Sequence, residues 1–463
     1  MDTELTIVIL AAGLGTRMKS SKAKVLHRAG GQTLIEHAVD TALQLTRPAR
    51  VWVVVGHQAD QVRQTLGSRG VGFIEQREQK GTGHALMVGR EALAGLGGLL
   101  MVLYGDCPLI SADTLRRLVE VQQQSGAAGV VITTLLDDPH GYGRVLLDDS
   151  ESVLAIVEQK AATAEQLQVR EINSGIYCFQ AADFWSRIDR IKTDNPANEY
   201  YLTDIVEILN RDGRPIRAMR IDDPAEVLGI NDRVQLAAVD AIFRARKVQE
   251  LMLSGVTIEK PETVSIDAGV RIGMDTIIEP FTRISGSTTI GEQCRVGACS
   301  ILEDAILGDR VVVGPFTSIA ASHLEDDAQV GPYARLRMGV HVETGAHIGN
   351  FVELKNTRLG AGSKAMHLAY LGDSGIGRNV NVGAGTITCN YDGQKKHRTT
   401  IGDGAFIGSN STLVAPLEIG EGAYLGAGSV ITKTVPPDAL GLGRARQENK
   451  ENWARKRRTA GRG

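Results

Sequence analysis

The sequence predicts an α/β, Rossmann-like domain followed by a left-handed parallel β-helix of hexapeptide repeats. In residues 1–230, apolar runs such as "LTIVIL", "VWVVVG" and "LLMVLYGD" alternate with segments whose apolar residues recur every three or four positions. This alternation is typical of a mostly parallel sheet covered by helices on both faces. After Gly255 the aliphatic residues recur every six positions, from Ile266 to Leu302 without a break. A chain of 463 residues is also too long for one ordinary core.

A six-residue period suits a parallel β-helix, in which each hexapeptide supplies one inward aliphatic residue and one turn. With three hexapeptides to a coil, residues 256–435 predict about ten coils. The period breaks between Lys355 and Leu371 and again over "TCNYDGQKKHR", and insertions in a solenoid often lie on its binding face. "INDRVQLAAVDAIFRARKVQELMLSG" predicts a connecting helix. We therefore divide the chain into a domain over 1–230, a linker helix over 231–253, a β-helix domain over 254–446 and a basic tail over 447–463.

Composition narrows the function class. A net charge of −3 and an apolar fraction of 43% indicate a globular protein without an electrostatic bias toward nucleic acid. The five cysteines are odd in number and form no CxxC, which disfavours a disulfide scaffold and a structural zinc site. The acidic start "MDTELT" and the lack of a long apolar stretch predict neither export nor a membrane span. We expect a cytoplasmic protein, with a solvated tail "NWARKRRTAGRG".

The first strand leads into "TIVILAAGLGTRM", a glycine loop. A dinucleotide fingerprint needs a third glycine where Met18 stands, and no GK[ST] follows to make a P-loop. A small-residue loop followed by Arg17 and Lys24 instead suits a nucleoside triphosphate, because the backbone can approach the ligand and the cations can neutralise phosphate. A plain strand–helix turn with two surface cations is the alternative.

Further motifs decide between these two interpretations. Together with "EQKGTGHA", "YGDCPL", "GYGRV", "IVEQK" and "INSGIY", the loop resembles the signature of sugar-nucleotide pyrophosphorylases. With the hexapeptide repeats behind it, residues 5–446 resemble the family of bifunctional N-acetylglucosamine-1-phosphate uridylyltransferases and glucosamine-1-phosphate N-acetyltransferases. The resemblance implies acetyl transfer from acetyl-CoA to glucosamine 1-phosphate, then uridylyl transfer from UTP to the product with release of pyrophosphate. These small molecules would be its ligands, and a homotrimer its assembly.

The resemblance also implies roles for residues of the first domain. Arg17 and Lys24 would neutralise phosphate, and Asp106 with Asn231 would hold Mg²⁺. The residues implied to bind UTP or UDP-N-acetylglucosamine are Leu10, Ala11, Ala12, Gly13, Lys24, Gln76, Gly81, Thr82, Tyr104, Gly105, Asp106, Gly143, Glu158, Asn173 and Asn231. Without the resemblance, Asp106 could be a helix N-cap before "PLISADTL" and Glu158 a partner in a surface ion pair.

In the second domain, a solenoid wall alone does not explain the polar residues of "YARLRMGVHVETGAHIGNFVELKNTRLGAGSKAMHLAYLG". His367 can serve as a base near neutral pH, and the resemblance implies that it deprotonates the amino group of glucosamine 1-phosphate. The residues implied to bind this acceptor are Arg337, Lys355, Tyr370, Asn381, Asn390 and Tyr391. Those implied to bind acetyl-CoA are Ala384, Ser409, Ala427 and Arg444.

Three positions depart from the family pattern. Leu14 replaces a residue that is often basic, Ala23 replaces a proline before Lys24, and Met338 replaces a proline after Arg337. The first two affect the expected affinity for nucleotide more than the chemistry, and we expect the third to be tolerated. Two other functions compete: a monofunctional pyrophosphorylase with a structural or regulatory β-helix, and a regulatory nucleotide-binding subunit with decayed sites. The second of these predicts loss of Arg17, Lys24, Asp106 or Asn231, yet all four are present.

Overall fold

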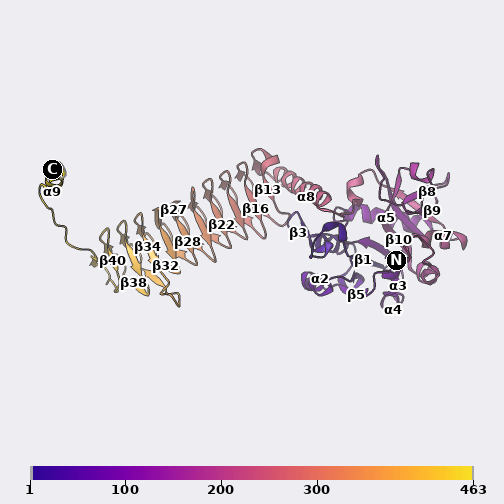
Figure 1. Ribbon diagram of the computed structural model, residues 1–463, viewed down its shortest axis with the longest axis horizontal. Coiled ribbons are helices and arrows are strands. Elements are labelled where there is room, and N and C mark those ends of the chain that lie inside the picture. Colours follow the sequence, from indigo (N-terminus) through magenta and orange to yellow (C-terminus); the bar gives the residue numbers. More distant parts are fainter. Residues whose placement is uncertain (1–3, 461–463) are drawn as a thin grey trace. The chain divides into compact units, whose positions relative to one another are not determined.

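A computed structural model describes residues 4–460 of the chain. Two compact units divide between Phe243 and Arg244. The first contains a mixed sheet with helices, and the second contains a stack of short strands (Figure 1). The fold class expected from the sequence is confirmed by both units.

The sheet of the first unit has the strand order β11-β7-β10-β6-β1-β4-β5. Strands β6, β1, β4 and β5 are mutually parallel, whereas β10 runs antiparallel to both β6 and β7. The strands are β1 (Leu5–Leu10), β4 (Val51–Val55), β5 (Gly72–Glu75), β6 (Leu99–Tyr104), β7 (Gly129–Leu135), β10 (Glu171–Gln180) and β11 (Ile216–Arg220), with β8 (Arg144–Leu147) and β9 (Val153–Val157) paired beside β10.

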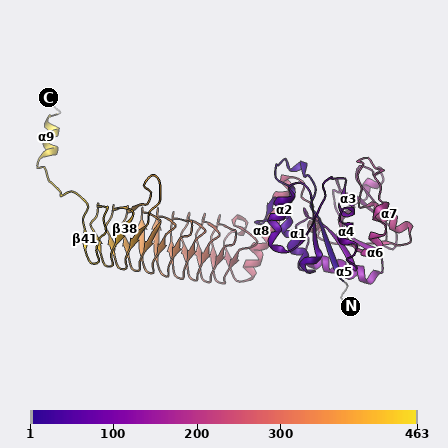
Figure 2. The same ribbon diagram turned by 90° about the horizontal axis from the view of Figure 1, so that it is seen from below.

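Helices cover both faces of this sheet, because alternate residues of the buried strands supply two apolar layers (Figure 2). Ile7 and Ile9 of β1 belong to one layer, and Val8 and Leu10 to the other. The first layer is covered by α1 (Leu34–Ala42), α2 (Ala59–Leu66) and α5 (Ala112–Ser125). The second is covered by α3 (Thr82–Met87), α4 (Arg90–Leu93), α6 (Ala181–Trp185) and α7 (Asp204–Arg211). The small strands β2 (Arg28–Ala29) and β3 (Gln32–Thr33) pair with each other before α1.

The second unit is a left-handed parallel β-helix with three sheets. The first sheet runs from β12 (Thr257–Ile258) to β41 (Leu440–Gly441), the second from β13 (Ser265–Ile266) to β40 (Val430–Ile431), and the third from β14 (Arg271–Ile272) to β38 (Leu417–Ile419). Each strand pairs in parallel with the strand one coil later, as Ile266 does with Ile284. The second sheet has ten strands, in agreement with the expected number of coils. The repeating aliphatic residues form the buried column inside.

One detail of the predicted repeat is wrong. Residues 355–371 continue the coils without interruption, through β29 (Arg358–Leu359), β30 (Lys364–His367) and β31 (Tyr370–Gly372). The inward position of β30 is held by Ala365, which is fully buried but too small to stand out in the sequence pattern. The other predicted break is a true insertion, since residues 390–398 form a loop between β34 (Ile387–Cys389) and β35 (Thr399–Ile401) that rises from the coils (Figure 2).

Two helices lie outside these layers. Helix α8 (Arg233–Leu253) spans the boundary between the units, and α9 (Trp453–Ala460) belongs to the basic tail. Over residues 4–460, no helix combines the length and the apolar character needed to cross a membrane.

Candidate functional site

A cavity of about 590 Å³ opens at the carboxyl ends of the central strands of the first unit. Leu10 and Tyr104, the last residues of β1 and β6, are register partners, so the loops that follow the two strands lie side by side. Gly15 has a φ of +61°, and a Cβ there would lie 2.6 Å from the Cβ of Lys24. The glycine loop can therefore pack directly against Lys24, which lines the cavity. Ligands of parallel sheets bind at this edge.

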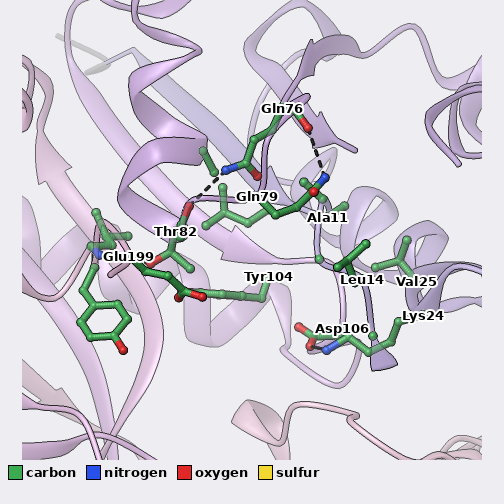
Figure 3. Close-up of a pocket in the computed structure, with 18 of the residues that line it drawn as sticks. Ala11, Leu14, Lys24, Val25, Gln76, Gln79, Thr82, Tyr104, Asp106 and Glu199 are labelled. Atoms are coloured by element: carbon green, nitrogen blue, oxygen red, sulfur yellow. Dashed lines mark hydrogen bonds and ion pairs between the residues drawn. The ribbon is translucent and has the colours of Figure 1, made fainter. Parts of the chain in front are cut away.

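Four charged or polar residues expected from sequence meet beside the cavity. The Lys24 ammonium forms an ion pair with Asp106 and lies 3.4 Å from the Asn231 side-chain oxygen. Arg17 donates a hydrogen bond of 2.8 Å to the same oxygen. A backbone hydrogen bond from Ile230 to Asp106 joins the two segments. Although these residues span more than 200 positions of sequence, the fold brings all four together. Figure 3 shows Lys24 beside Asp106.

The oxygens around Lys24 fit the donor set that Mg²⁺ prefers. A carboxylate oxygen of Asp106 and the amide oxygen of Asn231 both contact the Lys24 ammonium, so a positive charge already occupies the space between them. Mg²⁺ commonly binds one or two protein oxygens and takes its other ligands from phosphate and water. Within residues 4–460 no cluster of three or more His, Cys, Asp or Glu side chains is arranged to hold a metal. The oxygens of Asp106 and Asn231 therefore suit a Mg²⁺ ion that takes its remaining ligands from a bound nucleotide.

The base end of the cavity contains Gln76, Gly81 and Thr82. The Gln76 side chain donates to the Gly81 carbonyl oxygen at 3.1 Å and contacts His84 Nδ1 at 3.1 Å. Its backbone N–H donates to the Val55 carbonyl oxygen at 2.8 Å, which fixes Gln76, the residue after β5, beside the end of β4. Ala11, Ala12 and Gly13 line the same cavity and present main-chain groups. This end offers a pocket lined with hydrogen-bonding groups and small side chains.

The opposite end has Glu158 and Asn173. The Asn173 side-chain oxygen already accepts hydrogen bonds from Gly175 N–H at 2.9 Å and the Tyr177 hydroxyl at 3.0 Å, so its NH₂ group remains for a ligand. Burial, followed by the charges of Asp204 and Glu199, raises the pKa of Glu158. Gly143 is adjacent to Asn173, because the Asn173 N–H donates to the Gly143 carbonyl oxygen at 2.9 Å.

Sequence reasoning missed three residues at this end: Glu199, Tyr201 and Thr203 all line the cavity. The Thr203 hydroxyl is buried, and within the described chain it has no hydrogen-bond partner. All three lie in the irregular segment before α7, where no periodic pattern marks them. Only the polar composition of "NEYYLTD" hints at a binding role.

In the second unit, Lys355 and Arg337 end neighbouring strands β28 (Glu353–Lys355) and β25 (Arg335–Arg337) and are register partners. Lys355 is 5% exposed and its ammonium lies 3.0 Å from Asp373 Oδ2. Asn390 also donates to Asp373. Arg337 donates to Glu353 at 2.7 Å. Lys355, Arg337 and Asn390 thus place two cations and an amide at one corner of the coils. Asp373, which joins Lys355 to Asn390, was not expected from sequence.

Tyr370 is close to this corner. A Cβ on Gly372 would lie 2.6 Å from the Tyr370 hydroxyl and 2.7 Å from the Asn390 side-chain nitrogen. An adjoining cavity of about 410 Å³ is lined in part by Asp373 and by the cations of Arg358, Lys396 and Arg398. Lys396 belongs to the inserted loop, where Tyr391 pairs with it through an isolated bridge. Sequence reasoning missed these three cations. Lys396 and Arg398 approach only because the inserted loop folds back, and Arg358 lies in β29, where an outward arginine is ordinary.

His367 ends β30 in the first β-helix sheet and is exposed. Its Nδ1 lies 2.7 Å from the side-chain oxygen of Asn350, the register partner of His367 in β27 (His347–Asn350). An amide oxygen only accepts, so Nδ1 carries a proton and Nε2 is left with its lone pair. Asn381, in β33 (Asn381–Val382), lies in the same sheet. The imidazole is therefore oriented as a base by a neighbouring coil.

The proposed acetyl-CoA residues stack along one corner. Ala384, Ser409 and Ala427 each follow a strand of the first β-helix sheet by two residues. Hydrogen bonds of 2.7 Å from Asn410 to Ala384 and 2.8 Å from Gly428 to Ser409 join these turns. Arg444 follows the last strand, with its Cδ 4.0 Å from where a Gly428 Cβ would lie. Backbone groups and one exposed cation thus form a continuous ladder.

A single chain does not bring all acetyl-transfer candidates together. His367 and Asn381 belong to the first β-helix sheet, whereas Arg337, Lys355 and Tyr370 belong to the second. Among the hydrogen bonds and ion pairs of residues 4–460, none joins His367 to Arg337 or Lys355. The candidate base and the candidate phosphate-binding cations therefore belong to different sheets of the β-helix.

Comparisons with known proteins agree with both units. Residues 7–169 match the family model of the MobA-like NTP transferase domain. Residues 287–314 match the hexapeptide repeat of succinyl-transferase, and residues 398–433 match the bacterial transferase hexapeptide (six repeats).

Full-length relatives are more informative. The chain is 64% identical over 458 residues to "Bifunctional protein GlmU" of Solibacter usitatus (strain Ellin6076), covering 99% of this chain and 98% of that protein. It is 49% identical over 460 residues to the protein of the same name from Koribacter versatilis (strain Ellin345), covering 99% and 98%. Similarity at this level over both chains shows a shared family.

Proposed function

This chain belongs to the family of the bifunctional protein GlmU, and we propose how its residues divide two reactions between two units. The protein is a bifunctional transferase that makes UDP-N-acetylglucosamine, a precursor for cell-wall synthesis. Its hexapeptide-repeat part transfers the acetyl group of acetyl-CoA to glucosamine 1-phosphate. Its nucleotidyltransferase part then transfers the uridylyl group of UTP to N-acetylglucosamine 1-phosphate and releases pyrophosphate.

In uridylyl transfer, a phosphate oxygen of N-acetylglucosamine 1-phosphate attacks the α-phosphorus of UTP and pyrophosphate leaves. Arg17 and Lys24 stabilise the charge that develops on the phosphate oxygens, because both cations lie at the glycine loop. Main-chain groups of Leu10 to Gly13, with Gln76, Gly81 and Thr82, bind the uracil end. The Asn173 NH₂ group and the Glu158 carboxyl group bind the amino sugar, and Tyr104 lines the same pocket. Gly105 lies beside Ala11, and Gly143 lies beside Glu158 and Asn173, so we include both glycines in the binding site. Catalysis is therefore positioning and charge neutralisation, without a covalent intermediate.

Asp106 and Asn231 would hold Mg²⁺ through their oxygens. The ion, when bound, supplies positive charge to the phosphate groups of UTP. Lys24 pairs with Asp106, so its ammonium already lies beside the oxygens that would hold the ion, close to where the triphosphate is expected.

In acetyl transfer, His367 Nε2 accepts a proton from the neutral 2-amino group of glucosamine 1-phosphate as that nitrogen attacks the thioester carbon of acetyl-CoA. The C–S bond then breaks, and the departing CoA thiolate takes the proton from the His367 imidazolium. The Nδ1–H bond to Asn350 orients the ring and stabilises the imidazolium that forms. Arg337 and Lys355 bind the sugar phosphate, and Tyr370, Asn381, Asn390 and Tyr391 bind the sugar. The ladder of Ala384, Ser409, Ala427 and Arg444 binds acetyl-CoA.

A homotrimer is the assembly that we propose, because His367 and the phosphate-binding cations lie on different sheets of one prism. Packing three prisms side by side can bring one chain's first sheet toward another chain's second sheet. We place the enzyme in the cytoplasm, where acetyl-CoA and UTP are available and where its five free cysteines stay reduced. We also propose the domain boundaries at 230, 253 and 446.

The observation that carries the two-site assignment is the pair of separate polar clusters, one around Lys24 and Asp106 and the other around Lys355 and Asp373. The test is to give purified protein glucosamine 1-phosphate, acetyl-CoA, UTP and Mg²⁺ and to follow CoA and pyrophosphate separately. His367→Ala should abolish CoA release yet leave pyrophosphate release from N-acetylglucosamine 1-phosphate intact, and Asp106→Ala should do the reverse. Joint loss of both activities in either variant contradicts two independent sites. If the unmodified protein releases pyrophosphate from added N-acetylglucosamine 1-phosphate but no CoA from glucosamine 1-phosphate, a structural β-helix is supported instead.

A further inference from the structure

The Gln76 amide is held in one orientation. The side chain is 3% exposed, and its nitrogen lies 3.1 Å from the Gly81 carbonyl oxygen and 3.1 Å from His84 Nδ1. A carbonyl oxygen can only accept, so the end of the amide that faces Gly81 must be its NH₂ group. Both N–H bonds are then used inside the protein. Across residues 4–460 no donor meets Gln76 Oε1, which leaves this oxygen for a ligand in the cavity that Gln76 lines (Figure 3).

His84 completes this arrangement only in one protonation state. Its Nδ1 must accept from Gln76, so the single proton of the neutral ring lies on Nε2. The ring, near the start of α3, stacks on Tyr200 with centroids 6.0 Å apart. Hydrogen bonds from Gly83 to Tyr200 and from Tyr200 to Lys80, both of 2.8 Å, fix the two segments against each other. The imidazole therefore has a defined position beside the amide.

Uracil and cytosine differ in what they present to such an amide. At N3, uracil has an N–H donor, whereas cytosine has a lone pair. An oxygen facing the base complements uracil, and a rotated amide would present NH₂ and complement cytosine. We infer that His84 is a positioning residue that holds Gln76 in the uracil-reading orientation and thereby sets the preference for UTP over CTP. The inference rests on the proposed function, in which Gln76 contacts the base.

The fixed orientation depends on the acceptor at His84. Without it, the Gln76 NH₂ group would keep only the Gly81 carbonyl oxygen as a partner inside the protein, and one N–H would be left unpaired.

The experiment measures kcat/KM for nucleotidyl transfer from UTP and from CTP at about pH 8 and reports their ratio. The two nucleotides carry the same triphosphate, so effects on the phosphates cancel in the ratio. His84→Leu removes the acceptor, whereas His84→Asn keeps a non-titrating oxygen near the position of Nδ1. Acetyl transfer and the KM for N-acetylglucosamine 1-phosphate, measured on the same samples, show that each variant is folded.

At about pH 8 we expect His84→Leu to lower the UTP/CTP ratio about tenfold, the effect of one hydrogen bond, and His84→Asn to keep it within about twofold. An unchanged ratio in His84→Leu, or an equal loss in His84→Asn, overturns the inference. Gln76→Ala separates two failures: if it leaves the ratio unchanged, Gln76 does not contact the base and the proposed function is at fault. If it lowers the ratio while His84→Leu does not, only the role of His84 is wrong.

Discussion

Replacing Asp373 by asparagine removes the only carboxylate that pairs with Lys355 among residues 4–460. Asp373 accepts from Lys355 at 3.0 Å, from Asn356 at 2.8 Å and from Asn390. Its φ is +50°, a conformation that asparagine tolerates as well as aspartate, so the backbone needs no adjustment. The substitution therefore changes charge and hydrogen bonding while it keeps shape.

The cost follows from burial of the pair. The side chains of Lys355 and Asp373 are 6% and 12% exposed. Leaving one charge of a buried pair uncompensated costs about 3–5 kcal/mol, and asparagine keeps one oxygen, so we expect about 3 kcal/mol for Asp373→Asn. In Lys355→Met, by contrast, Asp373 keeps Asn356 and Asn390 as donors, and we expect about 1 kcal/mol. The two variants should therefore differ although they break the same ion pair.

The pH dependence has a definite sign. Burial acts to raise the pKa of Asp373, but hydrogen bonds from Asn356, Lys355 and Asn390 outweigh it and lower this pKa. Stability from a carboxyl group whose pKa falls on folding is present above its unfolded pKa of about 4 and is lost as pH falls further. The difference between Asp373→Asn and the unmodified protein should therefore be full at neutral pH and shrink below about pH 4.

Differential scanning calorimetry is the suitable assay. The tryptophans are Trp52, Trp185 and Trp453, so none lies within the coils and fluorescence does not report their unfolding. A loss of about 3 kcal/mol in a unit of this size should lower Tm of the β-helix transition by about 6–12 °C and leave the transition of the first unit in place. Equal Tm values for Asp373→Asn and Lys355→Met, or a loss that persists undiminished in acid, would refute the reasoning.

Three further perturbations have defined outcomes. Gly15→Ala should raise KM for UTP at least about tenfold, because φ of Gly15 is +61° and the new Cβ would lie 2.6 Å from Lys24 Cβ. Steady-state kinetics tests this, with acetyl transfer as the control, and an unchanged KM contradicts it. Leu14→Arg should lower KM for UTP severalfold at low salt, since Leu14 is 54% exposed and lines the cavity, and the gain should disappear as salt is raised. Burial first, and then Glu207, raise the pKa of Asp204 to about 6, so this carboxylate lowers stability as pH rises from about 4 to 6. Asp204→Asn should accordingly raise Tm of the first unit near pH 7.5 and leave it unchanged near pH 4; a gain at both pH values contradicts this.

Much of the fold follows from periodicity alone. Ile266 and Ile284 pair one coil apart because the six-residue pattern fixes both the inward side and the register. The pattern did not predict the coils where the inward residue is small, as at Ala365. It also did not predict them where one hexapeptide is a residue short, as between Leu354 and Leu359. The six-residue pattern is interrupted there, but the strands continue, because their backbones pair with those of the preceding coil.

The sites were less accessible to sequence. Arg17 and Asn231 form a hydrogen bond although 214 positions separate them in the sequence. Only the resemblance to a known family could suggest that they lie together. Thr203 and Lys396 lie in irregular loops, where no period indicates which way a side chain points. Asp373 was overlooked because a carboxylate at a turn is ordinary in a solenoid, and its role becomes visible only with Lys355 buried beside it.

The coils also suggest how such a molecule can change over evolutionary time. Successive coils repeat every eighteen residues where the pattern is regular, as from Ser265 to Arg283, and each coil pairs only with the coils next to it. All residues assigned to acetyl transfer lie at or after Arg337, so the earlier coils carry no chemistry. Gain or loss of a whole coil in that region keeps every inward side chain inward. The early coils are thus a stretch whose length natural variation can alter in steps of one coil while the reacting groups keep their geometry.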